Sequence, residues 1–504
     1  MKKLFKNAKF YTMRDKNGDF LADFDEFFNS MVTKDGKIEK VDNDIEGESF
    51  DEIIDLDGKT ALPSFTDSHV HFFQSGFLLD GADFSNVFDQ DELLSLIASS
   101  IEGRRFFQSW GYDPARVSDD AELPTKEMLD KIDSEIPIFI RRKDGHSSAV
   151  NSASIKLLSE NLDNFRLEND KGHLYDSNHL DAERYFLGLA GEEELHRAIE
   201  AVEKEALTVG ATSIHSLVHR KDWARILMNA RTKIETNIYL ESWNPVDAAE
   251  IGLNRVGGCL LLDGSFGSHT AALSFPYKDR PDWQGKLYRT DRDLINFLET
   301  AQNTNLQTSV HSIGDRSTMQ MLEIHEKFPD IFFRNLRHRI EHAELQSNEH
   351  LALAKKLNIV YAMQPAFELY WGGLDNMYGE RLGKMALSTN RYRSILAEGI
   401  VIAGGSDSYI TPIDPLLGIH AACNHPNEME ALEIGPAIRM FSFGGPYAVS
   451  QEGSLGTLEE GKKASFVILD NDPFETDKKA IKDIDVLQTF IKGESAYRKG
   501  DAND

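Results

Sequence analysis

Short apolar runs alternate with amphipathic stretches along most of this chain. Residues 192–208 carry apolar side chains at nearly every third or fourth position (Leu195, Ile199, Val202, Ala206), and the run ATSIHSL follows after Gly210. Apolar residues at helical spacing predict an amphipathic helix, and brief apolar runs predict buried strands. The expected strands are 64–70, 211–217, 234–240, 259–264, 306–311, 336–343, 358–364 and 400–407. Eight strands separated by helical stretches predict an α/β fold, a (β/α)8 TIM barrel.

The two ends of the chain have a different pattern. Residues 1–61 and 446–504 alternate brief apolar runs with Gly-containing turns such as KDGK and LDGK. Asp-Gly between apolar runs is typical of β-hairpins. We therefore expect a small β-sandwich domain built from both termini, with the barrel at 62–445. Residues 84–190 do not fit the alternation and predict an insertion after the first barrel strand, where loops form the active site and a lid can lie.

Composition narrows the classes of partner. The chain has 55 Lys and Arg against 83 Asp and Glu, a net charge of −28. This excess of negative charge disfavours nucleic acids and anionic membranes as partners. No run has the length of a signal peptide core or a membrane span, and two cysteines provide no disulfide framework. We expect a cytoplasmic protein that acts on a small molecule, with a homodimer as the default assembly.

Candidate metal ligands stand at the ends of the predicted strands. His69 and His71 end the first strand and point the same way, because strand side chains alternate faces. His311, His342 and Asp407 end three later runs, and barrel active sites gather at the carboxyl ends of the strands. Imidazole and carboxylate ligands suit a divalent cation, zinc in the first place. Such an ion lowers the pKa of water from about 15.7 towards 7, which predicts metal-assisted hydrolysis with Asp407 as general base.

Longer motifs point to a family. The stretches HVH, SVHSIGDR, RHRIEHAELQ, MQPAF and IAGGSD together resemble the amidohydrolase superfamily, in particular its branch that includes N-substituted formamide deformylase. The resemblance covers about residues 60–475. It implies a distorted (β/α)8 barrel with a small β-sandwich, and metal-dependent hydrolysis of carbon–nitrogen bonds other than peptide bonds. The residues that match its metal ligands are His69, His71, His311, His342 and Asp407, and Asp407 also matches its base.

Two positions depart from that pattern. Cys259 stands where this branch often has a lysine, four residues before the aspartate of the DGS motif; elsewhere in the superfamily a carboxylated lysine bridges two metal ions. A thiolate can ligate zinc, but free cysteine is also commonly a small buried residue. We therefore expect a single ion with Cys259 as a packing residue, and a pair of ions bridged by its thiolate is the alternative. His269 replaces an arginine after the GS of the same motif, and it either faces the substrate or lies in an exposed loop.

Two further residues are candidates for substrate binding. Asp263 begins the loop after the fourth strand, where it can hold a substrate group or simply make an Asp-Gly turn. His146 lies in the family-like stretch RRKDGHSSAVNS and can donate to a substrate carbonyl or cap a helix.

The absence of one side chain argues against deamination as the reaction. Deaminases of the superfamily typically carry a glutamate three residues after the fifth-strand histidine, and this chain has Gly314 there. We therefore expect hydrolysis of an amide, formamide or cyclic amide. The alternatives are a deaminase or ester hydrolase of the same superfamily and a barrel that binds a small molecule without turnover. Aromatic residues near the strand ends favour an apolar or aromatic substrate: Phe72, Phe73, Trp110, Phe367, Tyr370 and Trp371.

Overall fold

The computed structural model describes residues 1–501 except 15, 44, 46–47, 82–83, 85–86, 88, 113–121, 143–146, 164 and 168. The chain folds as two compact units. One unit contains residues 1–71 and 203–504, and the other contains residues 72–202.

The larger unit contains the predicted barrel. Its eight strands form one parallel sheet in the order β5-β10-β11-β12-β13-β14-β15-β16. Their bounds are β5 Phe65–His71, β10 Ala211–Val218, β11 Glu235–Leu240, β12 Arg255–Val256, β13 Gln307–Ser312, β14 Arg339–His342, β15 Val360–Met363 and β16 Ile402–Gly404. The two edges meet because the backbone N–H of Asp407 donates to the carbonyl of His69 (2.9 Å) and that of His71 donates to Ser408 (2.8 Å). The predicted fold class is confirmed.

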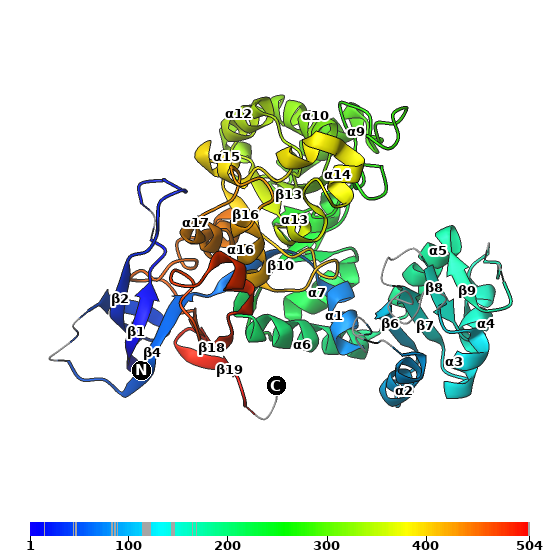
Figure 1. Cartoon of the computed structure of the whole chain (residues 1–504), viewed down its shortest axis with the longest axis horizontal. Helices are drawn as coiled ribbons and strands as arrows, with labels where there is room; N and C mark the ends of the chain where they lie inside the picture. The colour runs from blue at the N-terminus through cyan, green and yellow to red at the C-terminus, as the bar shows by residue number, and fades with distance from the viewer. Residues whose placement is uncertain are drawn as a thin grey trace. The chain divides into compact units, whose positions relative to one another are not determined.

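Helices lie around these strands (Figure 1). They are α6 Glu192–Thr208, α7 Lys221–Asn229, α8 Val246–Glu250, α9 Asp291–Asn303, α10 Asp315–Glu326, α11 Ile331–Arg334, α12 Asn348–Leu357, α13 Ala366–Trp371, α14 Met377–Leu382, α15 Tyr392–Ala397, α16 Pro415–Cys423, α17 Ile434–Arg439 and α18 Gly445–Ala448. Local sequence explains their ends: Thr290 forms a capping box at the start of α9, and Asn358 ends α12 in the left-handed conformation. Helix α6 has the bounds that the apolar spacing predicts.

The fourth strand does not occupy the predicted range 259–264. The regular strand is Arg255–Val256, and Leu261 makes only an isolated bridge to His311. The cause is the pair Gly257 and Gly258, which have φ values of +110° and +101°. A Cβ at Gly257 would lie 1.8 Å from the carbonyl oxygen of Ser309, so only glycine fits there. The segment after the glycines is consequently irregular, and it carries Cys259.

The chain ends form a second sheet in the same unit. Seven strands hydrogen-bond in the order β19-β18-β17-β4-β1-β2-β3, and the blue and red strands of Figure 1 show that both termini contribute. The bounds are β1 Lys2–Tyr11, β2 Phe27–Lys34, β3 Lys37–Asp42, β4 Glu52–Pro63, β17 Phe466–Leu469, β18 Val486–Ile491 and β19 Glu494–Arg498. Its core includes Phe466 and Phe490, whose rings stack 4.5 Å apart. Both ends of the chain thus contribute to one sheet, as expected; a separate β-sandwich domain with the bounds 1–61 and 446–504 stays a prediction.

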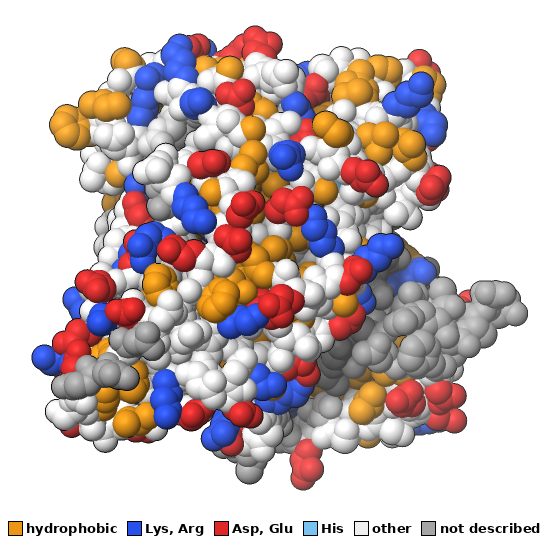
Figure 2. Space-filling view, turned by 60° about the vertical axis from the view of Figure 1, so that its left-hand side comes forward, with side chains coloured by type: hydrophobic (Ala, Val, Ile, Leu, Met, Phe, Trp, Pro, Cys, Tyr) orange, Lys and Arg blue, Asp and Glu red, His pale blue; other side chains and the backbone are white. Residues whose placement is uncertain are grey.

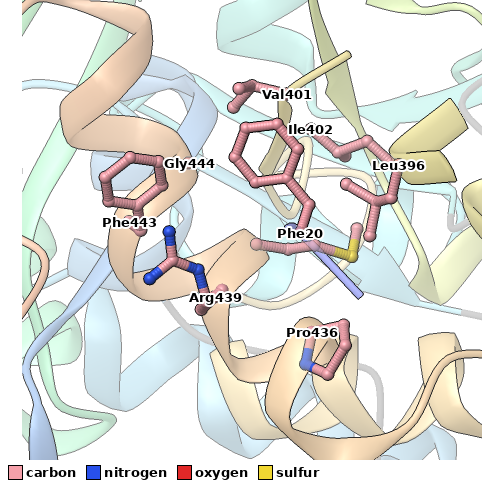
Figure 3. A pocket seen from close by; sticks show the side chains of 9 residues that line it. Phe20, Leu396, Val401, Ile402, Pro436, Arg439, Phe443 and Gly444 are labelled. Carbon is pink, nitrogen blue, oxygen red and sulfur yellow. The ribbon is translucent and has the colours of Figure 1, made fainter. Parts of the chain in front are cut away.

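Arg439 contacts both the segment after β1 and the barrel. Its guanidinium donates to the carbonyl of Met13 and lies 4.4 Å from the ring of Phe24 and 4.2 Å from that of Phe443. Figure 3 shows the small cavity beside it, where Phe20 lies near Leu396 and Ile402. Apart from Arg439, this cavity is lined by apolar residues and Gly444, so it belongs to the packing of the N-terminal segment.

The smaller unit contains the predicted insertion. Its sheet has the order β6-β7-β8-β9, with β6 Phe107–Tyr112, β7 Ile138–Arg142, β8 Ser147–Val150 and β9 His173–Tyr175. Its helices are α1 Phe72–Asp80, α2 Gln90–Ser100, α3 Lys126–Ile132, α4 Ser152–Asn161 and α5 Asp176–Gly188. Leu93, Leu129 and Ile138 belong to a buried cluster of its own. The lid role of the insertion stays a prediction.

Two surface observations bear on the expected partners. Among the described residues, no helix has both the length and the apolar character needed to cross a membrane. On the face drawn in Figure 2, Lys and Arg side chains are interspersed with Asp and Glu and form no extended basic patch.

Candidate metal centre

The barrel brings the predicted ligands together. The ring centroids of His69 and His342 are 5.0 Å apart, and those of His311 and His342 are 4.5 Å apart. Asp407 Oδ1 lies 3.2 Å from Nε2 of His69 and 3.1 Å from Nε2 of His71. Three sets of donor atoms each lie within 4.8 Å of one another: His69 with His71 and Cys259, Cys259 with His311 and His342, and His69 with His342 and Asp407. The three sets share members, so the six candidate ligands form one connected cluster.

Several of these atoms lack hydrogen bonds. His69 Nε2, His342 Nε2 and Asp407 Oδ1 are buried and make no hydrogen bond within the described part of the chain. A buried polar atom without a partner costs about 1–3 kcal/mol, so three such atoms facing one another indicate a ligand that satisfies them. Nitrogen, oxygen and sulfur donors in this number suit a divalent transition metal. The residues present fit such an ion.

Hydrogen bonds at the far side of each ring define which nitrogen is available. Nδ1 of His69 lies 2.5 Å from Oε2 of Glu341, and Nδ1 of His342 lies 2.7 Å from Oε1 of Gln364. His311 has Nε2 3.3 Å from the carbonyl of Gly264. Because those acceptors require an N–H, the lone pairs are on Nε2 of His69 and His342 and on Nδ1 of His311. These are the nitrogens that face the centre.

The charges of the centre favour a cation. Burial tends to raise the pKa of Asp407, but His69 and His71 outweigh burial and lower it. Burial also opposes ionisation of Cys259, yet His311 outweighs it and holds the thiol pKa well below its usual range. Burial opposes protonation of His69, His71 and His311. The pKa of His69 and of His71 is nevertheless raised well above 6.5, and Cys259 raises that of His311 to about 9. Without a metal ion, the centre therefore holds protons, which a cation displaces on binding.

Two candidate ligands have strained backbones. His342 has a φ of +69° and Asp407 a φ of +59°, in the left-handed region that side chains other than glycine rarely adopt. Such a conformation costs about 1–3 kcal/mol and persists only where the surrounding structure enforces it. Here the enforcing contacts include the barrel-closing hydrogen bond from the Asp407 N–H to His69. Strain at both residues agrees with a functional site.

The candidates for substrate binding are held by other contacts. The carboxylate of Asp263 accepts from the backbone N–H groups of Ala272 (2.8 Å), Gly314 (2.8 Å) and Ile313 (3.0 Å). It thus joins the loop after the fourth strand to the end of β13. Nε2 of His269 lies 2.8 Å from Asp279. His146 and the side chain of Trp110 lie outside the described residues. Binding of substrate by Asp263, His269 and His146 stays a prediction.

Other residues at the centre do not stand out in the sequence. Glu341 and Gln364 contact ligand histidines. In the sequence, however, Glu341 is simply a polar residue inside a strand, and Gln364 is a polar residue directly after a strand. Aromatic rings also contact the ligands: Phe367, which the sequence did indicate, stacks on His342 (6.0 Å, 12°), and Tyr409, which it did not, lies edge-on to His71 (5.7 Å). Only the pairing of strands shows which of these side chains face the centre.

A parallel barrel with histidine and aspartate donors at its strand ends defines a hydrolase that uses a divalent metal ion. Comparison with known proteins agrees, because a model of the amidohydrolase family matches residues 52–497. The chain belongs to the amidohydrolase family.

Individual relatives match over nearly the whole chain. The putative amidohydrolase YtcJ of Bacillus subtilis (strain 168) is 27% identical over 99% of this chain and 100% of the relative. The N-substituted formamide deformylase of Arthrobacter pascens is 21% identical over 89% of this chain and 90% of the relative. The crystal structure of an uncharacterized metal-dependent hydrolase from Pyrococcus horikoshii OT3 has a TM-score of 0.78 at 25% identity, covering 95% of this chain and 99% of that one.

Proposed function

We propose that this protein hydrolyses a carbon–nitrogen bond other than a peptide bond, in an amide, formamide or cyclic amide. Water is the nucleophile, a divalent metal ion (zinc) is the cofactor, and Asp407 is the general base. The observation that carries the proposal is the position of Asp407 Oδ1, which lies within 3.2 Å of two ligand histidines and makes no hydrogen bond in the described structure.

Each group has a defined task. The residues that would hold the cation are His69, His71, His311, His342 and Asp407. When bound, the ion supplies Lewis acidity and lowers the pKa of water. Asp407 is ionised, because His69 and His71 hold its pKa below the usual range against the effect of burial, so it can take the proton of water and pass it to the leaving nitrogen.

Cys259 decides between one ion and two. Its sulfur belongs to one donor set with His69 and His71 and to another with His311 and His342. It also packs against a small apolar cluster that includes Leu217, so packing and ligation are not exclusive here. Cys259 would therefore be able to help hold an ion in either donor set, and this shared membership supports a second metal ion.

The choice of amides over deaminase substrates rests on Gly314. A Cβ at this position would lie 2.1 Å from the carbonyl oxygen of Ala272. No side chain fits there, so the glutamate that superfamily deaminases use to protonate nitrogen has no room. The name of the relative N-substituted formamide deformylase, together with the aromatic rings of Phe367 and Tyr409 beside His342 and His71, supports amides with apolar substituents.

The test is a substrate panel with the zinc-loaded protein. N-substituted formamides, N-acyl amines and cyclic amides are compared with aminopurines, cytosine-type rings and aryl esters, and the released amine, ammonia or acid is measured. We expect turnover of at least one amide class. Turnover of the rings or esters alone would establish one of the alternative hydrolases, and tight binding without any turnover would establish a binding protein.

A further inference from the structure

A buried ion pair lies directly behind the His69 ligand. Arg339 and Glu341 both have fully buried side chains, and Nη2 of Arg339 lies 2.8 Å from Oε2 of Glu341. The same oxygen lies 2.5 Å from Nδ1 of His69. The other carboxylate oxygen accepts from the hydroxyl of Ser309. Glu341 therefore has one fixed position, and its negative charge faces the ring of a metal ligand.

Arg339 is itself held from several sides. Its Nη2 donates to the carbonyl of Ser68 (2.7 Å), and its Nη1 donates to Nδ1 of His215 (2.7 Å). The guanidinium lies 4.5 Å from the ring of Tyr239. Residues from β5, β10, β11 and β14 thus fix this one side chain in the barrel interior. Such a network places Glu341 rigidly, because a planar guanidinium pairs with carboxylates in a defined geometry.

His69 on β5 and His342 on β14 differ in what lies behind their rings. His69 contacts a carboxylate, whereas His342 contacts the neutral amide of Gln364 at 2.7 Å. Both partners fix the same tautomer, with the N–H on Nδ1. A carboxylate also makes the imidazole a more basic ligand, which an amide does to a lesser degree. Of these two ligands, only His69 therefore has a negative charge directly behind its ring; the carboxylate nearest His311, that of Asp263, lies 3.8 Å from Nε2.

We propose that Glu341, held in place by Arg339, is a positioning residue that fixes His69 as an Nε2 ligand and strengthens cation binding through it. This inference rests on the metal centre of the proposed function but not on the bond that is cleaved. Metal affinity consequently tests it whether or not an amide is hydrolysed.

The first variant is Glu341→Gln, which keeps the acceptor oxygen and removes the charge. Zinc affinity is measured by chelator competition, and the ligand field by the visible absorption of the cobalt-loaded protein. We expect zinc affinity about 10- to 100-fold lower than in the wild type and a shifted cobalt spectrum. The matched control is Glu430→Gln, because Glu430 is a buried carboxylate that accepts from the backbone N–H of Ser394 (2.9 Å) and pairs with Arg391 (3.3 Å) away from the ligands.

A purely structural role for Glu341 gives a different result. In that case the metal-free Glu341→Gln protein unfolds at a lower temperature than the control variant, while zinc affinity and the cobalt spectrum stay as in the wild type. That outcome would overturn the proposal.

A second variant is informative even if the first fails to fold. Gln364→Glu places a carboxylate behind His342 in nearly the same shape, and it removes the hydrogen bond that Gln364 Nε2 donates to the carbonyl of Ala362 (3.2 Å), so circular dichroism must first show that the variant is folded. We expect tighter zinc binding, because the second ligand histidine then gains the support that His69 has. Unchanged or weaker binding would contradict a role for charge behind the ligands.

Discussion

The sulfur of Cys259 lies 3.5 Å from Nδ1 of His311. This nitrogen carries the lone pair of His311, because Nε2 is directed at the carbonyl of Gly264. A thiolate and an imidazole lone pair at this distance are suited to share one cation. Since Cys259 also belongs to a donor set with His69 and His71, two of the possible cation sites share its sulfur.

Replacing Cys259 by Ala should reduce the metal content from about two zinc ions per chain to one. Elemental analysis of the purified variants measures this directly. Cys423→Ala is the control, because Cys423 is buried in α16 and burial raises its thiol pKa to about 12. One ion in the wild type and in both variants would make Cys259 a packing residue.

Replacing Asp407 by Asn should lower kcat by about 10²- to 10⁴-fold, the usual contribution of a positioned general base. The amide has nearly the same shape, so the metal-free variant should show the circular dichroism of the wild type. Initial rates at saturating substrate, with metal content determined on the same sample, separate loss of the base from loss of the ion. A metal-loaded variant with unchanged kcat would exclude Asp407 as the base.

Metal affinity should rise with pH between about 6.5 and 9. The pKa of His311 is raised to about 9, and those of His69 and His71 are raised well above 6.5, so the metal-free centre is protonated at neutral pH. Binding releases these protons, and removing them at higher pH favours the bound state. Each released proton contributes about tenfold per pH unit. Chelator competition at several pH values measures the slope, and a flat profile would contradict this charge assignment.

Replacing Asp263 by Ala should destabilise the metal-free protein by about 3 kcal/mol or more. The substitution leaves three backbone N–H donors without their acceptor, and each unsatisfied buried donor costs about 1–3 kcal/mol. Urea unfolding followed by circular dichroism measures the loss. If Asp263 instead binds substrate without holding the loop, KM increases while the free energy of unfolding changes by less than about 1 kcal/mol.

The sequence by itself determined the barrel and the main donor set. Side-chain alternation in a strand and helical spacing in an amphipathic segment are local properties, so they can be read from neighbouring residues. For the same reason the HVH motif placed His69 and His71 on one face of the first strand. The apolar runs that lead to His311, His342 and Asp407 marked the ends of three further strands.

The tertiary structure decided what depends on contacts between distant segments. Asp407 lies beside His69 because the edge strands β5 and β16 meet and close the barrel. Cys259 enters the centre because Gly257 and Gly258 adopt positive φ values against Ser309, which no local pattern encodes. Glu341 lies behind His69 because β14 and β5 place these two side chains together in the barrel interior, where a buried carboxylate requires partners from several strands. Hydrogen bonds across the sheet, and not the order of residues along one strand, determine these three relationships.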